Sequence, residues 1–197
     1  MLVGVFLMLL VGCDFINPKD ENNVPTRGQI TEAVYKNEYL GFEFTKPDSW
    51  VYSTDAEIAA AMNMGAEMLG EKFQDAIKNS PSVYDMMVVD SITRSNINVG
   101  YENLAKTLSS NITVEQYIEA LKSQLSSVSS MTVSFPDKYD TVKLGKNEYT
   151  RVICNAKASG IQMTQVYYLS KMDGYMGFVI VTITNGYTVA DIEAMFK

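Results

Sequence analysis

The stretch EYTRVICNAKASGIQMTQVYYLSKMDGYMGFVIVTIT, residues 148–184, decides the fold class of this chain. It contains segments rich in β-branched and aromatic residues at 148–157, 161–170 and 175–184. Ala158-Ser159-Gly160 separates the first two segments, and Asp173-Gly174 leads into the third. Parallel strands need a crossover of a dozen or more residues, so strands joined by such short turns run antiparallel. The stretch therefore predicts an antiparallel meander.

Further strands are predicted upstream of the meander. Residues 29–36 and 41–46 alternate apolar and polar positions around a turn at 37–41, which indicates a hairpin. Residues 84–93 and 96–101 are also rich in β-forming residues, and the two segments can pair as a second hairpin. A single strand is expected at 132–135.

Three capping boxes predict where helices begin, because a Thr hydroxyl and an acid or amide three residues later satisfy each other's backbone N–H groups. They are Thr54 with Glu57, Thr113 with Gln116, and Thr188 with Asp191. The first precedes a long apolar stripe at helical spacing, made of Ile58, Met62, Ala66, Leu69, Phe73 and Ile77. We expect one long helix there, although Gly65 and Gly70 weaken it, and further helices at 114–127 and near the C-terminus.

The order of these elements predicts an α+β fold, an antiparallel β-sheet covered by helices in an α/β/α sandwich. Residues 29–197 contain no internal repeat or interdomain linker, so they are expected to form a single domain of ordinary size.

The first residues indicate a secreted chain. Residues 1–12, MLVGVFLMLLVG, are apolar but too few to span a bilayer, which takes roughly 20 residues. The run suits the apolar region of a signal peptide. It ends in Leu10-Val11-Gly12-Cys13, which resembles the lipobox of bacterial lipoproteins. That resemblance implies cleavage after the small residue Gly12 and a diacylglyceryl group on the Cys13 thiol.

Two further expectations concern this leader. No Lys or Arg precedes the apolar run, as a signal peptide would require, so we expect the true start to lie upstream. The alternative is an ordinary buried helix with a chance cysteine. Residues 13–28 are polar and contain Pro18 and Pro25, which is typical of a flexible tether. The sequence therefore predicts a domain anchored to the membrane through lipid, on the extracytoplasmic face of a bacterial cell.

Composition excludes several functions. The net charge of -7 argues against binding to nucleic acid and to anionic lipid headgroups, both of which require basic patches. The chain has no histidine, which rules out Ser-His-Asp and Cys-His catalysis and histidine-based zinc or iron sites. If Cys13 carries lipid, Cys154 is the only free thiol, and its place among Val152 and Ala156 predicts core packing over reactivity.

Other candidate sites are weak. Gly65–Lys72 has the glycines of a phosphate loop, but Glu71 stands where the lysine is required. Carboxylate pairs at Asp85 with Asp90 and at Asp137 with Asp140 leave a hydrolase mechanism open, although such pairs are usually solvated.

The methionines of the first long helix and the following strand allow two interpretations. They are Met62, Met64, Met68, Met86 and Met87. Packing in or beside the core is the preferred one. The alternative is an apolar groove for varied partners, because methionine side chains adapt to irregular surfaces.

The run Tyr39–Trp50, YLGFEFTKPDSW, resembles the opening of PsbP-like domains, in which an aromatic hairpin is followed by Pro and Trp. The order of elements extends this resemblance over 29–197. The chain is also similar to uncharacterised lipoproteins of Gram-positive gut clostridia. Family members support photosynthetic water oxidation or bind the GTPase Ran, so the resemblance implies a role in binding or assembly. We therefore expect a non-catalytic lipoprotein that needs no cofactor and binds an envelope protein or ligand. The alternative is a carboxylate-dependent surface hydrolase.

Overall fold

The meander is the centre of the fold. The computed structural model describes residues 24–197. Within them, β9 (Asn147–Ala158), β10 (Ile161–Met172) and β11 (Tyr175–Ile183) pair antiparallel, with Val166 opposite both Ile153 and Val181. Positive φ angles at Gly160 (83°) and Gly174 (89°) make the two tight turns. The predicted meander is confirmed.

The meander belongs to a large sheet of eight strands in the order β4-β5-β6-β11-β10-β9-β7, with β8 also on β9. The hairpin partners are β5 (Ser82–Asp90) and β6 (Asn96–Asn103), as expected, with a bulge at Asp85. The outer strands are β4 (Trp50–Tyr52), β7 (Met131–Ser134) and β8 (Asp140–Leu144). Every strand pair in the described part of the chain is antiparallel.

A second sheet holds β1 (Gln29–Ile30), β2 (Val34–Asn37) and β3 (Phe42–Thr45). The predicted hairpin is confirmed, but its first strand is divided, because Thr31 N–H turns back to the carbonyl oxygen of Val34 at 2.8 Å. On the far side of β3, the backbone groups of Glu43 and Lys197 exchange hydrogen bonds of 2.9 and 2.8 Å. The C-terminus is therefore tied to this sheet.

The single long helix expected after Thr54 is wrong. The chain forms α1 (Asp55–Ala61), a 3₁₀ turn η1 (Ala66–Leu69) and α2 (Phe73–Asn79). Asn63 has a φ of 55°, a left-handed conformation that ends a right-handed helix. Ile58, Leu69 and Ile77 are nevertheless buried, so the apolar spacing identified the inward side chains although it overestimated helix length.

The remaining helices are α3 (Leu104–Thr107), α4 (Val114–Ser126) and α5 (Val189–Glu193). All three predicted capping boxes are present, at the starts of α1, α4 and α5. In each, the Thr hydroxyl accepts from the backbone N–H three residues later.

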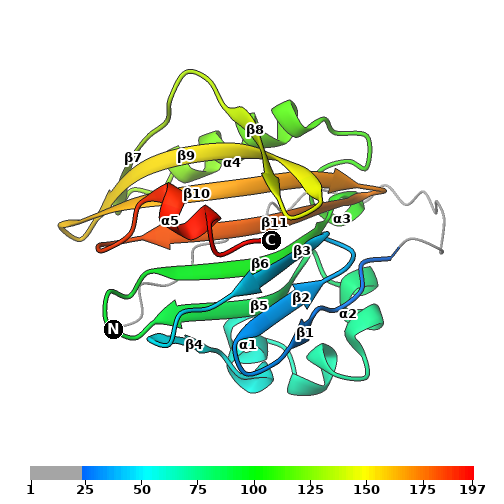
Figure 1. Cartoon of the computed structure of the whole chain (residues 1–197). Coiled ribbons are helices and arrows are strands. Elements are labelled where there is room, and N and C mark those ends of the chain that lie inside the picture. The colour runs from blue at the N-terminus through cyan, green and yellow to red at the C-terminus, as the bar shows by residue number, and fades with distance from the viewer. Residues whose placement is uncertain (1–23) are drawn as a thin grey trace.

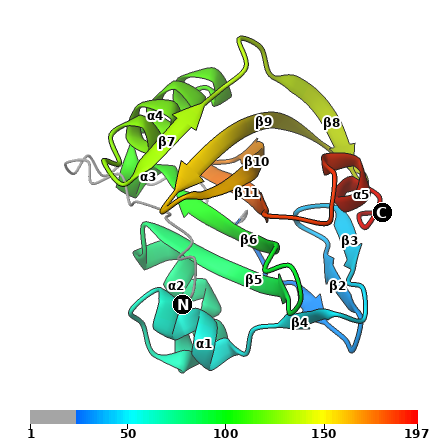
Figure 2. The same cartoon turned by 90° about the vertical axis from the view of Figure 1, so that its left-hand side faces the viewer.

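The elements form layers on the large sheet (Figures 1 and 2). Helices α1, α2 and α4 lie against one face, and the small sheet β1–β3 lies with α5 against the other. The α+β class and the antiparallel sheet are confirmed. The second outer layer, expected to be helical, combines the small sheet with one short helix.

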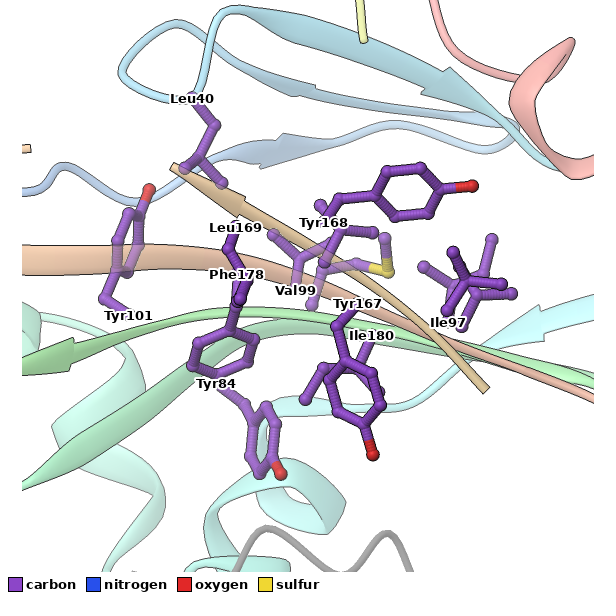
Figure 3. Packing of buried hydrophobic residues seen from close by; sticks show 14 of the residues in the cluster. Leu40, Tyr84, Ile97, Val99, Tyr101, Tyr167, Tyr168, Leu169, Phe178 and Ile180 are labelled. Atoms are coloured by element: carbon purple, nitrogen blue, oxygen red, sulfur yellow. The ribbon is translucent and has the colours of Figure 1, made fainter. Parts of the chain in front are cut away.

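Aromatic side chains fill both interfaces (Figure 3). Tyr84 and Tyr167 point toward the helical layer, and Tyr168 points toward the small sheet. Gly177 allows the small sheet to approach, because a Cβ there would lie 2.7 Å from the Leu40 side chain. Both faces of the large sheet therefore belong to one continuous hydrophobic core.

Candidate binding site at one end of the large sheet

The described part of the chain has a surface hollow of about 580 Å³ at the end of the large sheet where β9 turns into β10. Its walls come from β7, β9, β10 and the segment that follows β11. The lining residues on which the argument depends are Thr132, Ser134, Asn155, Lys157, Gln162, Thr164, Ile183 and Tyr187.

Strand register builds the floor of the hollow. Ser134 lies opposite Asn155, Asn155 opposite Thr164, and Thr164 opposite Ile183. Directly opposed residues point to the same face of a sheet, so these side chains form a row across four strands. The row lies on the face that carries α5, since Arg151, which shares a face of β9 with Asn155, binds Glu193 at 2.8 Å.

The lining mixes polar and apolar groups, with the polar ones slightly in excess, and it is nearly uncharged. A second row places Thr132 opposite Lys157 and Lys157 opposite Gln162. These three side chains are exposed. Lys157 is the single charged residue among those that line the hollow, and no acidic residue is among them. Hydroxyl and amide groups can donate and accept hydrogen bonds, so the surface suits a polar ligand.

The segment after β11 closes one side of the hollow and is held firmly. The Trp50 indole N–H donates to the Tyr187 hydroxyl at 2.9 Å, and the two rings pack at 5.6 Å between centroids. Thr184 Oγ1 donates to the carbonyl oxygen of Thr93 at 2.5 Å. Gly186 has a φ of 79°, which favours glycine at this bend. The wall of the hollow is therefore tied to β4 and to the β5–β6 turn.

The first described residues lie at the opposite end of the sheet (Figure 1). The Thr26 carbonyl oxygen accepts from the Tyr101 hydroxyl at 3.0 Å, and Tyr101 pairs with Gly177 on β11. Ile183, on the floor of the hollow, is six residues further along the same strand. At about 3.3 Å per residue, roughly 20 Å separates the two points.

A buried polar cluster fastens this end of the chain. We define the Asp85 cluster as Arg27, Tyr35, Asn37, Asp85 and Tyr101. Asp85 Oδ2 accepts from the Tyr35 hydroxyl at 2.6 Å and from Asn37 Nδ2 and Gly28 N at 2.8 Å each. Arg27 Nε lies 3.5 Å from Asp85 Oδ1. Burial raises the pKa of Asp85, while the hydrogen bonds and the Arg27 charge act in the opposite direction.

Arg27 also connects the cluster to the helical layer. Its guanidinium donates to Asp55, with Nη1 2.8 Å from Oδ2, and to the carbonyl oxygen of Leu69. Gln74 Nε2 donates to the carbonyl oxygen of Pro25 at 2.9 Å. Residues 24–28, which the sequence assigned to the end of the tether, therefore contact the domain at several points.

The structure does not bring the predicted carboxylate pairs to the hollow. Asp85 is buried in the Asp85 cluster, at the other end of the sheet. Asp90 accepts from the Thr93 hydroxyl at 2.6 Å inside the β5–β6 turn. Five residues of extended strand place the two roughly 15 Å apart. Asp140 pairs with Arg151 at 3.0 Å, and Asp137 is exposed.

One acidic group was missed by sequence reasoning. Glu102 is 6% exposed, and its Oε2 accepts from the Tyr117 hydroxyl at 2.5 Å. Burial raises the pKa of Glu102 and holds that of Tyr117 well above its ordinary value. Among the described residues, four buried side-chain oxygens have no hydrogen-bond partner: Ser82 Oγ, the Tyr84 hydroxyl, Asp85 Oδ1 and Glu102 Oε1. Alternation along β6 puts Glu102 on the same face as Asn98 and Gly100, so the sequence pattern indicated an outward side chain. Glu102 is buried because both faces of this central strand are covered.

The remaining candidates are structural. Cys154 is fully buried, and burial raises the pKa of its thiol to about 11, which confirms the predicted packing role. Met86 is buried, and the other four methionines are partly buried against the core, also as predicted. Gly65–Lys72 contains η1 and forms no strand-to-helix turn. Cys13 lies outside the described residues.

Residues 24–197 contain neither a metal-binding cluster nor a membrane-spanning helix. That part of the chain has no group of three or more His, Cys, Asp or Glu side chains placed to hold a metal ion. It also has no helix with the length and apolar character needed to cross a bilayer.

Comparison with known proteins bears on the fold. No family model and no curated protein matches the chain. The solution structure of cyanobacterial PsbP (CyanoP) from Synechocystis sp. PCC 6803 is similar, with a TM-score of 0.50 and 11% identity over 85% of this chain and 93% of that one. The fold is PsbP-like. A crystal structure from Bacteroides thetaiotaomicron also matches, with a TM-score of 0.39 and 12% identity over 80% of this chain and 44% of that one.

Proposed function

We propose that this chain is a membrane-anchored extracytoplasmic lipoprotein whose PsbP-like domain binds a ligand or an envelope protein without catalysing a reaction. The anchor is the diacylglyceryl group expected on Cys13, after the lipobox-like Leu10-Val11-Gly12. A diacylglyceryl group supplies two acyl chains, which is enough for stable attachment to a bilayer.

The character of the hollow carries the binding role. Its rows of hydroxyl and amide side chains supply many hydrogen-bonding groups and one charge, on Lys157. The alternative function, a carboxylate-dependent hydrolase, needs two carboxyl groups that flank the bond to be cleaved. The carboxylates considered from the sequence, at 85, 90, 137 and 140, are not part of this lining, so binding is the better supported role for this surface.

The position of the hollow supports the same role. Thr26, which accepts from Tyr101, lies at the other end of the large sheet, and the eleven residues from Cys13 to Val24 would reach on the order of 20 Å as a flexible chain. A domain tethered at that end presents its far end away from the bilayer. A surface in that position is accessible to envelope components.

The anchor and the hollow are tested separately. Cells that express the full chain with Cys13→Ala should fail to incorporate labelled fatty acid, and the protein should leave the membrane fraction. Continued labelling of that variant would overturn the anchor. It would leave the binding role to be judged by the second test.

For the hollow, a photo-crosslinking amino acid is placed at Gln162, and in a matched control at Glu119 on the exposed side of α4. We expect one discrete adduct in living cells from position 162 that position 119 does not give. Thr164→Trp, which fills the hollow, should abolish that adduct. Identical adduct patterns from both positions would refute binding at this site.

A further inference from the structure

Asn185 and Gly186 form the only Asn-Gly pair in the chain, and both line the hollow. Both residues are exposed. The backbone N–H of Gly186 donates to Oδ1 of Asn185 at 2.9 Å. Oδ1 is bonded directly to Cγ, so the Gly186 nitrogen lies close to the amide carbon of the neighbouring side chain.

We propose that Asn185 is a site of spontaneous deamidation, which changes the charge and the shape of the hollow. The Gly186 nitrogen gives up its proton to solvent and attacks Cγ of Asn185. A C–N bond forms, the side-chain nitrogen leaves as ammonia, and the product is a cyclic succinimide. Water then adds to one of the two ring carbonyls and breaks one C–N bond, which yields aspartate or isoaspartate. Overall, one water is consumed and one ammonia is released.

Local geometry distinguishes Asn185 from Asn79 and Asn155, the two other described asparagines that precede a serine or an alanine. Asn79 also precedes a small residue, but the following nitrogen, on Ser80, donates to the Ala76 carbonyl oxygen at 2.8 Å. Asn155 lies within β9, where neighbouring strands pair on both sides. The backbone at Asn79 is therefore fixed by the end of a helix, and the backbone at Asn155 is fixed by the sheet. Gly186 lies instead in an exposed bend with a φ of 79°, and its backbone N–H donates to the Asn185 side chain itself.

The product would alter the hollow in two ways. Either isomer adds a carboxylate to a lining in which Lys157 is otherwise the single charged residue. Isoaspartate also lengthens the main chain by one methylene, immediately before Tyr187. Since the Tyr187 hydroxyl accepts from the indole of Trp50, the only tryptophan of the chain, the change has a natural fluorescence reporter. This inference does not depend on what the hollow binds.

The test incubates the folded full chain in mildly alkaline buffer, followed by trypsin digestion and mass spectrometry. Cleavage after Lys171 releases residues 172–197, in which Asn185 is the only asparagine. We expect this peptide to gain one mass unit and to divide into aspartyl and isoaspartyl forms. The peptides that contain Asn79 and Asn155 should stay unchanged.

Two variants complete the experiment. Asn185→Gln removes the five-membered ring pathway and should abolish both the mass gain and the accompanying change in Trp50 fluorescence. Asn185→Asp reproduces the new charge without lengthening the main chain. The proposal is overturned if the peptide 172–197 of the folded chain stays unmodified while a denatured sample is converted. Conversion of Asn79 at the same rate would equally overturn the argument from local geometry.

Discussion

Removing the Arg27 side chain should destabilise the domain far more than its partial exposure suggests. Arg27→Ala deletes the guanidinium that faces Asp85, whose side chain is fully buried, while the Arg27 side chain itself is 25% exposed. The same change removes the contacts with Asp55 and with the Leu69 carbonyl oxygen. Asp85 would keep its hydrogen-bond donors Tyr35, Asn37 and Gly28 but lose the positive charge of the neighbouring Arg27.

The expected size of the effect follows from the two ion pairs. Removing one partner of a buried pair typically costs about 3–5 kcal/mol. The pair with Asp55, whose side chain is 47% exposed, adds at most about 1 kcal/mol. Because burial already raises the pKa of Asp85, that carboxyl can take up a proton and avoid part of the penalty. We therefore expect a loss of about 3 kcal/mol in the free energy of unfolding at neutral pH.

The loss should depend on pH. The pKa of Asp85 is higher in the folded than in the unfolded chain, so the folded chain binds more protons between the two values. Asp85 therefore contributes its full stabilisation at pH values below its pKa in the unfolded chain. This stabilisation is lost as the pH rises through the pKa of Asp85 in the folded chain. Without the guanidinium the folded pKa rises further. The deficit of Arg27→Ala should therefore be largest at neutral pH and smaller in mild acid.

Urea unfolding, followed by Trp50 fluorescence and by circular dichroism, measures this deficit. Lys36→Ala is the matched control, because it breaks the exposed pair with Glu43 at 3.2 Å and should cost less than about 1 kcal/mol. If Arg27→Ala is no more destabilising than the control, the guanidinium does not stabilise the buried Asp85. An equal loss of stability at neutral and mildly acidic pH would contradict the same role.

Three further outcomes are expected. Tyr117→Phe removes the donor to the buried Glu102 carboxylate and should lower the free energy of unfolding by about 1–3 kcal/mol in urea, and an unchanged midpoint would contradict this. In thermal unfolding, Gly145→Ala should be about 2 kcal/mol more destabilising than Gly160→Ala. Both positions have a positive φ, but a Cβ at 145 would lie 2.5 Å from two backbone carbonyl oxygens, whereas the space at 160 is open. Cys154 should react with a disulfide reagent only after unfolding, because burial raises the pKa of its thiol to about 11, and rapid labelling of the folded chain would show the burial to be wrong.

Elements bounded by local chemistry could be predicted from the sequence, and the others could not. The meander was predictable because Gly160 and Gly174 supply the positive φ of its turns. The break after α1 depends on one left-handed residue, Asn63, which the apolar spacing does not reveal. Strand β8 was missed because its residues are mostly exposed, as an edge position allows, and α3 because it has only four residues.

The candidate site was beyond sequence reasoning for a different reason. Ser134, Asn155 and Thr164 come from three strands and meet only through the register of the sheet. Each is an ordinary polar residue on the exposed side of a strand, and none carries a motif. The buried Asp85 was noted in the sequence, but only as half of a carboxylate pair. Its true partners, Arg27 and Tyr35, are more than forty positions away.

The location of the Asp85 cluster has a mechanical consequence under the proposed anchoring. Any pull from the membrane enters the domain at Val24 and first meets the hydrogen bonds at Pro25 and Thr26. It then meets Arg27 and Gly28, which transmit the load to β5 in the large sheet and not to the two-residue edge strand β1. Breaking these contacts would leave the buried Asp85 carboxylate without its positive partner and without one of its donors, which is costly. The hollow, at the other end of the same sheet, shares no residue with these contacts.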